Sequence, residues 1–294
     1  MAKLRRILKW LVLGLGLSLV LVVLAAVIYT RSDNFTRWVR EQAVSTVNDF
    51  IRGSISVDRL EGSVWRRLTL FNLTLRYEEV EILRIPRLEV AFSLIPLIRG
   101  RLQISQFDAL QPRADLRQDG EGRWNVVEAL APRQPESEQS SAFTTVVRSL
   151  RLREAGIDLR IAGEKEEKLY HARNLNLEGG LGLLPEGVSL EVRELASGFT
   201  SQGLPDLNLK GALDYRQLAG APLTLKINDL WAVSQNSRIK LNGEVVQSGA
   251  LQVKAQARLD KLAPSDVGYF VADWPLRRDL AGDLAVNGSL DDTL

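Results

Sequence analysis

The stretch LNLKGAL at residues 207–213 alternates apolar and polar residues and carries a glycine at its fifth position. The same order, apolar-x-apolar-x-Gly-x-apolar, recurs as LNLEGGL at 175–181, IKLNGEV at 239–245 and LAVNGSL at 284–290. The four glycines are 32, 32 and 45 residues apart (211 − 179, 243 − 211, 288 − 243). Alternation with period two is typical of β-strands, and a glycine inside a strand marks a bend or bulge. The four copies therefore predict an elongated β-array in which each unit buries its apolar face against the next.

The same alternation extends upstream, and an interruption in it divides the chain into two β-segments. Leu88, Val90, Phe92 and their neighbours predict a first β-segment over residues 54–131, with a short helix near 126–130. Residues 132–142, which begin PRQPESEQSS, lack hydrophobic periodicity and predict a flexible linker and domain boundary. The repetitive β-array then covers 143–294. No polar capping element follows Leu290, so we expect the array to continue beyond Leu294.

An uncharged run, WLVLGLGLSLVLVVLAAVIYT, occupies residues 10–30. Its twenty-one residues would form a helix of about 31 Å, which matches a hydrocarbon core of about 30 Å. Four basic residues precede the run, so residues 1–31 predict a cytoplasmic tip and a transmembrane signal-anchor, with the rest of the chain outside the cytoplasm. Cleavage after Val23-Leu24-Ala25 as a signal peptide is the alternative. Retention is favoured because the run exceeds the usual apolar region of about 7–15 residues.

Residues 32–53 predict an amphipathic helix directly after this run. Its apolar residues recur at helical spacing and are Phe35, Trp38, Val39, Ala43, Val47, Phe50 and Ile51. Its polar face carries Arg37, Arg40, Glu41, Asn48 and Asp49. The apolar stripe could pack on the neighbouring sheet and cap its end, which we favour, or lie on the lipid surface.

Composition and missing motifs argue against several classes of function. A hydrophobic content of 45%, a charged content of 25% and a net charge of +2 describe a folded protein without the basic excess of a nucleic-acid-binding protein. The chain has no cysteine and a single histidine, His171, which follows a charged run and is expected at a solvated hairpin tip. Asp115 and Asp158 occupy matching positions of an echo, ADLR against IDLR, which favours a structural role over a carboxylate pair in catalysis. We therefore expect no enzyme activity, no cofactor and no metal.

Two further motifs connect these features to a known family. LEGSVWRRLTLFNL at residues 60–73 and DGEGRWN at 119–125, together with the signal-anchor and the amphipathic helix, resemble the N-terminal region of the TamB family. TamB proteins are translocation and assembly module subunits within the wider AsmA-like, bridge-like lipid transfer group. The resemblance implies a single-pass inner-membrane protein of diderm bacteria whose periplasmic part is a curled, taco-like β-sheet with an apolar groove. It also implies phospholipid acyl chains as ligands and an outer-membrane barrel partner of the TamA type, engaged by a C-terminal region absent here.

Three functions follow as hypotheses. The first is a periplasmic bridge that moves phospholipids between the inner and outer membranes through the apolar groove. The second is an assembly factor for outer-membrane β-barrel proteins that pairs with an edge strand, and the third is a passive periplasmic tether. Alternation alone fits both a packed core and a lipid-filled groove. The candidate groove residues are Leu207, Leu209, Leu213, Ile239, Leu241, Val245, Leu284, Val286 and Leu290.

Overall fold

The computed structural model describes residues 33–63, 67–93, 96, 101–133, 144–163, 167–201, 205–268 and 277–290. The membrane span predicted at 10–30 and most of the linker predicted at 132–142 lie outside these ranges. Among the described helices, none is both long enough and apolar enough to cross a bilayer.

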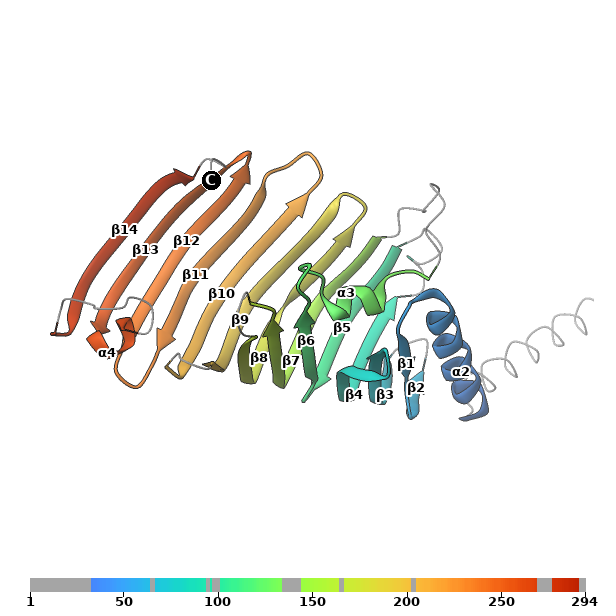
Figure 1. Cartoon of the computed structure of the whole chain (residues 1–294). Helices are drawn as coiled ribbons and strands as arrows, with labels where there is room; N and C mark the ends of the chain where they lie inside the picture. The colour runs from blue at the N-terminus through green and yellow to red at the C-terminus, as the bar shows by residue number, and fades with distance from the viewer. Residues whose placement is uncertain are drawn as a thin grey trace, which may run out of the picture.

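The described chain is mainly β, as predicted, and fourteen strands form one long, curled sheet (Figure 1). The first six strands are β1 (Ser54–Ser56), β2 (Arg59–Ser63), β3 (Arg67–Tyr77), β4 (Val80–Ser93), β5 (Arg101–Leu110) and β6 (Arg113–Gln118). The remaining strands are β7 (Thr144–Ile161), β8 (Lys168–Leu184), β9 (Gly187–Ser201), β10 (Leu207–Leu218), β11 (Leu223–Val233), β12 (Arg238–Ser248), β13 (Ala250–Leu262) and β14 (Leu280–Leu290). The described helices are α2 (Asp33–Phe50), α3 (Asn125–Leu130) and α4 (Pro264–Val267).

From β2 to β5 and from β7 to β14, each strand pairs antiparallel with the next. β1 pairs with β3, and the parallel pairings lie around the predicted linker. β5 and β6 follow one another along β4 on one side, and both pair in parallel with β7 on the other. The two predicted β-segments therefore share one sheet. The domain boundary within residues 132–142 stays a prediction.

The echo noted in the sequence is part of this junction. β6 and β7 pair so that ADLR at 114–117 lies beside IDLR at 157–160, with Asp115 opposite Asp158. His171 lies inside β8 opposite Asp158 and not at a hairpin tip, so that expectation was wrong. The tip lies further along, because β7 ends at Ile161 and β8 begins at Lys168.

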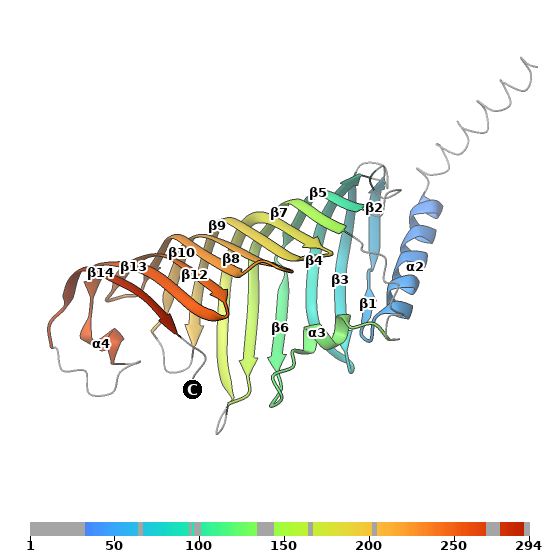
Figure 2. The ribbon, with the colours of Figure 1, turned by 90° about the horizontal axis from the view of Figure 1, so that it is seen from above.

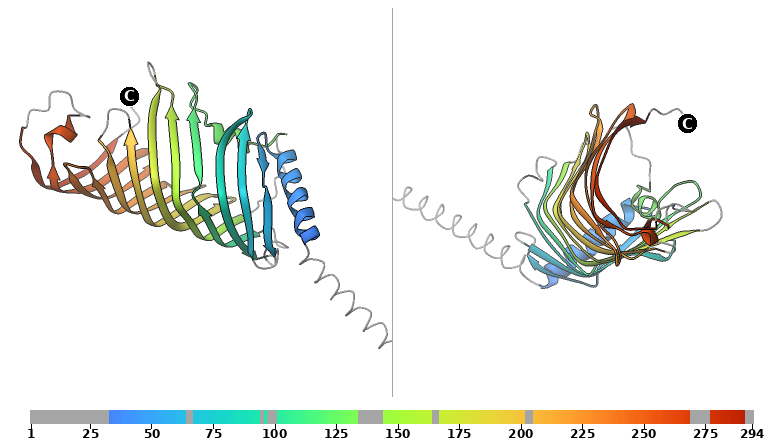
Figure 3. Two further views of the ribbon diagram at one scale, coloured as in Figure 1. Left: turned by 90° about the horizontal axis from the view of Figure 1, so that it is seen from below. Right: turned by 90° about the vertical axis from the view of Figure 1, so that its left-hand side faces the viewer.

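Buried apolar side chains gather at the N-terminal end of the sheet. One cluster joins Ala129 of α3 to Ile51, Leu75 and Ile82, and a second joins Ile85, Leu88 and Ala109. α3 lies on the inner side of the curl, which Figure 3 shows in the end-on view. This packing makes the apolar side of β3 the inner side of the sheet.

Left-handed residues bend several strands of the sheet, and we call the line of these bends the crease. Non-glycine residues with positive φ occur in the middle of β3 (Asn72), between β5 and β6 (Gln111), and within β7 (Glu154), β8 (Asn174) and β11 (Asp229). Register shifts accompany them in β7, β8 and β11. Each such residue bends its strand and restores the side-chain alternation beyond it. Figure 2 shows the resulting arch of the sheet.

Candidate functional site: an apolar sheet face

One cross-strand row of apolar residues and glycines runs the length of the sheet. Following the pairing from β3 to β14, every partner is Leu, Val, Phe, Ile, Ala or Gly. In strand order the row contains Leu68, Val90, Phe107, Leu150, Gly179, Val192, Leu213, Ile227, Gly243, Ala255 and Val286. Paired residues in a sheet point to the same side. We call the side that carries this row the apolar face.

Strand pairing places eight of the nine residues predicted for the groove on this face, and the ninth is Leu290 at the end of β14. Leu213 and Val286 are members of the row itself. A neighbouring row pairs Leu209 with Ala232, Ile239 and Leu259, and another pairs Leu230 with Leu241, Ala257 and Leu284. Val245 pairs with Leu225 and Val253, Leu207 with Phe199, and Leu290 with Leu251. Backbone register therefore places residues from strands β10, β12 and β14 on one face of the sheet.

Several members of the apolar face were missed by the repeat motif. Phe107, Val192 and Ile227 lie on strands β5, β9 and β11, which lack the glycine-centred unit. In these strands, the alternation of apolar and polar residues is the signal that could have identified them. The glycine pattern selected β8, β10, β12 and β14 only.

The apolar face is uncovered in the C-terminal half of the described sheet. Leu207, Leu209, Leu213, Ile239, Leu241 and Val245 are all half-buried. Leu284 and Val286 are more open, with 57% and 60% of their surface exposed. Beyond Val192, the described buried apolar residues are Leu259 and Ala263. A packed core buries such side chains almost completely, so this face lacks a second layer among the described residues.

The opposite face is polar and charged. In β13 the residues between the apolar positions, such as Lys254 and Arg258, are exposed. Ion pairs connect neighbouring strands on this side, including Lys226 to Glu244 at 3.1 Å. One face thus presents hydrocarbon and the other presents charge, which is the arrangement expected of a sheet whose two faces contact different surroundings.

A cluster of charges on the polar face contains the sole histidine. The Asp158 carboxylate accepts a hydrogen bond from Arg173 at 2.7 Å and lies 2.6 Å from His171 Nδ1, while Arg117 pairs with Asp115 at 2.7 Å. Partial burial raises the pKa of the Asp158 carboxyl, but the hydrogen bonds with His171 and Arg173 outweigh it and lower that pKa below its ordinary value. Each aspartate therefore has a basic partner, which gives the cluster the character of an ion-pair network across β6, β7 and β8.

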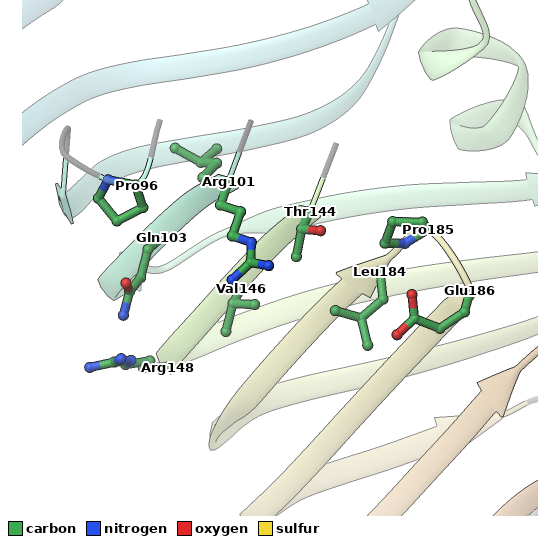
Figure 4. Close-up of a pocket in the computed structure, with 10 residues that line it drawn as sticks. Pro96, Arg101, Gln103, Thr144, Val146, Arg148, Leu184, Pro185 and Glu186 are labelled. Atoms are coloured by element: carbon green, nitrogen blue, oxygen red, sulfur yellow. The ribbon is translucent and has the colours of Figure 1, made fainter. Parts of the chain in front are cut away.

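A separate cavity of about 710 Å³ lies at the end of β5 and β7 (Figure 4). Its lining includes Arg101 and Gln103 of β5 and Thr144, Val146 and Arg148 of β7. These residues alternate with Leu102 and Val147, so they project from the polar face. Two guanidinium groups beside apolar side chains can hold an anionic group. This cavity is distinct from the apolar face.

The fold and this face define a class: a single-layer, curled β-sheet protein with one continuous apolar side. Residues 1–263 match the family model described as the AsmA family. The chain therefore belongs to the AsmA family. Among curated proteins, none matches the sequence.

Proposed function

We propose that this protein is a phospholipid conduit, anchored in the inner membrane and extending into the periplasm, in which acyl chains travel along the apolar face. The supporting observation is the unbroken apolar row from β3 to β14, together with the half-exposed side chains that surround it in β10–β14. At the level of the family, membership of the AsmA group fits a bridge-like lipid transport or outer-membrane assembly role. The motifs at 60–73 and 119–125 make the TamB branch the finer proposal.

Energetics explain why a lipid needs such a face. Exposing an acyl chain of about 16 carbons to water costs on the order of 13 kcal/mol, at about 0.8 kcal/mol for each methylene. A continuous apolar lining removes most of that cost at every point of the path. The charged headgroup stays in water beyond the open side of the sheet, so no polar group has to be buried. Conduction of this kind requires no chemical step, and we propose none.

The length of the row suits more than one lipid. It crosses eleven strands, which at a spacing of about 4.8 Å gives a path of roughly 48 Å. One leaflet of a bilayer accommodates an acyl chain within about 15 Å. Several lipids can therefore lie in file along the described part of the sheet.

Site-specific photo-crosslinking in cells tests whether lipid occupies this face. A photoreactive phenylalanine analogue is placed in the full chain at Leu209 or Leu241, and the matched controls are the adjacent polar-face positions Asn208 and Lys240. Labelled phospholipid is expected on the protein at the two leucine positions and not at the controls. Lipid at neither leucine position, in a correctly folded protein, would show that the proposal is wrong.

A charge pair tests whether the bound lipid is moving. The double variant Leu209→Asp with Leu241→Asp places two carboxylates in the path, and each carries a large cost of desolvation against an acyl chain. The control, Asn208→Asp with Gln252→Asp, changes the net charge equally on the polar face. We expect outer-membrane lipid balance to fail with the first pair alone. If the Leu209→Asp, Leu241→Asp variant folds and the lipid balance of the outer membrane stays normal, conduction is excluded. Static lipid binding is then the remaining function of the apolar face.

Edge pairing is a second candidate, and the outer edge of β14 favours it. Within the described residues β14 pairs only with β13, and its Leu284 and Val286 side chains are exposed. An open strand edge of this kind can template a strand of another protein, including an outer-membrane barrel partner. Crosslinks from β14 to a barrel protein, combined with no lipid at Leu209 and Leu241, would favour edge pairing over lipid conduction.

A further inference from the structure

The side of α2 that faces the sheet carries the polar residues Arg40 and Asn48 as well as half-buried Val44, and buried Ile51 follows directly after the helix. Asn48 hydrogen-bonds to both backbone groups of Ile55 in β1, donating to the carbonyl at 3.0 Å and accepting from the N–H at 2.6 Å. About two turns earlier in the helix, Arg40 donates to the backbone carbonyl of Asp58. Both residues were assigned to the polar face of the helix. Of the predicted apolar stripe, Ile51 is buried against the sheet, and these polar side chains also hold α2 to the end of the sheet.

Four residues of the predicted apolar stripe lie on the flank of α2, next to the side that faces the sheet. Val39, Ala43, Val47 and Phe50 follow one another at spacings of four, four and three, so they lie along one side of the helix. Ala43 is exposed, Val47 has 37% of its surface exposed and Phe50 has 58%. Val39 is half-buried. Helices of water-surrounded proteins normally turn such a stripe inward, so this one requires an apolar neighbour outside the sheet.

The position of α2 in the chain identifies that neighbour as a lipid bilayer. α2 begins at Asp33, three residues after the uncharged run ends at Thr30. Three residues reach at most about 10 Å, which is comparable to the depth of the headgroup layer. A helix tethered so closely to the end of a membrane span starts at the membrane surface. With two arginines against three acidic residues, its attraction to the surface is apolar and not electrostatic.

We propose that α2 lies in the plane of the membrane interface, with the stripe Val39, Ala43, Val47 and Phe50 inserted among the acyl chains. Asn48 and Arg40 then fix the β1–β3 end of the sheet to a helix that is itself held on the bilayer (Figure 1). The apolar face would open directly onto the lipid surface at that end. This inference rests on the predicted span and not on conduction, so either can fail without the other.

Spin labelling tests the inference directly, because the natural chain has no cysteine to remove. Single cysteines are introduced at Val47 and Phe50 on the stripe and, as controls, at Gln42 and Ser45 on the exposed polar side of the same helix. The full-length chain is labelled and reconstituted in vesicles of phosphatidylethanolamine and phosphatidylglycerol. Power-saturation spectra then compare collisions with oxygen, which concentrates in lipid, and with a water-soluble nickel chelate.

The labels at Val47 and Phe50 are expected to show an oxygen-to-nickel collision ratio several-fold higher than those at Gln42 and Ser45. High nickel accessibility at all four positions would overturn the proposal, since the stripe would then face water. Low accessibility to both agents at Val47 and Phe50 would also overturn it, because that signature means burial against protein. A Val47→Asp substitution is expected to lower the ratio measured at Phe50, and an unchanged ratio would contradict the insertion of the stripe.

Discussion

At the scale of single residues, the buried carboxylate of Asp266 shows how a small polar network anchors an otherwise loose end of the sheet. Asp266 has only 6% of its surface exposed and accepts a hydrogen bond from the hydroxyl of Ser234 in the β11–β12 turn. Ser237 of the same turn accepts from the N–H of Ala263, just before α4. Burial raises the pKa of the Asp266 carboxyl, but the hydrogen bonds from Ser234 and its neighbours outweigh burial and lower that pKa below its ordinary value. The charged form is therefore the one that the fold stabilises.

The Asp266→Asn substitution is expected to lower the free energy of unfolding by about 1–3 kcal/mol at neutral pH, because the serine hydroxyls lose their charged acceptor. A folded pKa below the unfolded value means that this stabilisation is present at neutral pH and is lost as the pH falls below about 4. The difference between the two proteins should therefore disappear in acid. Thermal unfolding measured across pH checks this, with Asp214→Asn, which removes a carboxylate that has no ion pair among the described residues, as the control. A difference that persists in acid would contradict the assignment.

At the scale of elements, the in-strand glycines decide how closely neighbouring strands approach. A Cβ at Gly179 would lie 2.0 Å from the carbonyl oxygen of Glu191, and one at Gly211 would lie 2.6 Å from the Cα of Leu230. Both glycines stand at register shifts between strands. The prediction that these glycines mark bulges is therefore confirmed at both positions. Gly288 on β14 carries the same motif, yet an added Cβ there would meet nothing within 4 Å.

Alanine substitutions test whether close strand approach, and not membership of the repeat motif, is what requires glycine at a position. Gly211→Ala is expected to cost about 1–3 kcal/mol, because backbone atoms of β11 would have to move away from the new methyl group. Gly288→Ala is the matched control and should change stability little. Thermal unfolding of the two variants tests the difference. Equal costs at both positions would mean that the close approach of β10 and β11 is not what requires glycine.

At the scale of the whole molecule, burial is distributed unevenly along the sheet. Both hydrophobic clusters lie at the end formed by β3–β7 with α3, whereas β10–β14 contribute few buried apolar residues among those described. Each strand also contacts mainly its neighbours in the sheet order. Stability in such an array is a sum of local terms, so the two ends need not unfold together.

Amide hydrogen exchange of the full chain should therefore show a gradient of protection. We expect the slowest exchange in β4, β5 and β7, where side chains are buried on the apolar face, and progressively faster exchange toward β13 and β14. Exchange measured by mass spectrometry on peptides from each strand checks this order. One uniform rate for all strands would indicate a single cooperative unit and contradict the local picture.

Local pattern in the sequence determined much of this molecule. Period-two alternation was enough to predict a mainly β protein, and the candidates Leu209, Leu241 and Val286 could be named because alternation assigns each residue to a face within its own strand. The helical spacing of residues 35–51 likewise predicted a helix, which the structure places at Asp33–Phe50. Family motifs pointed to the AsmA group in the same way.

Only the tertiary structure decided how these local pieces face one another. No local pattern contains the parallel pairing of β5 and β6 with β7, the crease through Asn72 and Asp229, or the exposure of the α2 stripe. Each depends on register between residues far apart in the chain, and a shift of one residue in that register would exchange the two faces of a strand. Alternation can say that a strand has an apolar side. Whether that side is covered depends on which other elements reach it, and in β10–β14 none of the described elements does so fully.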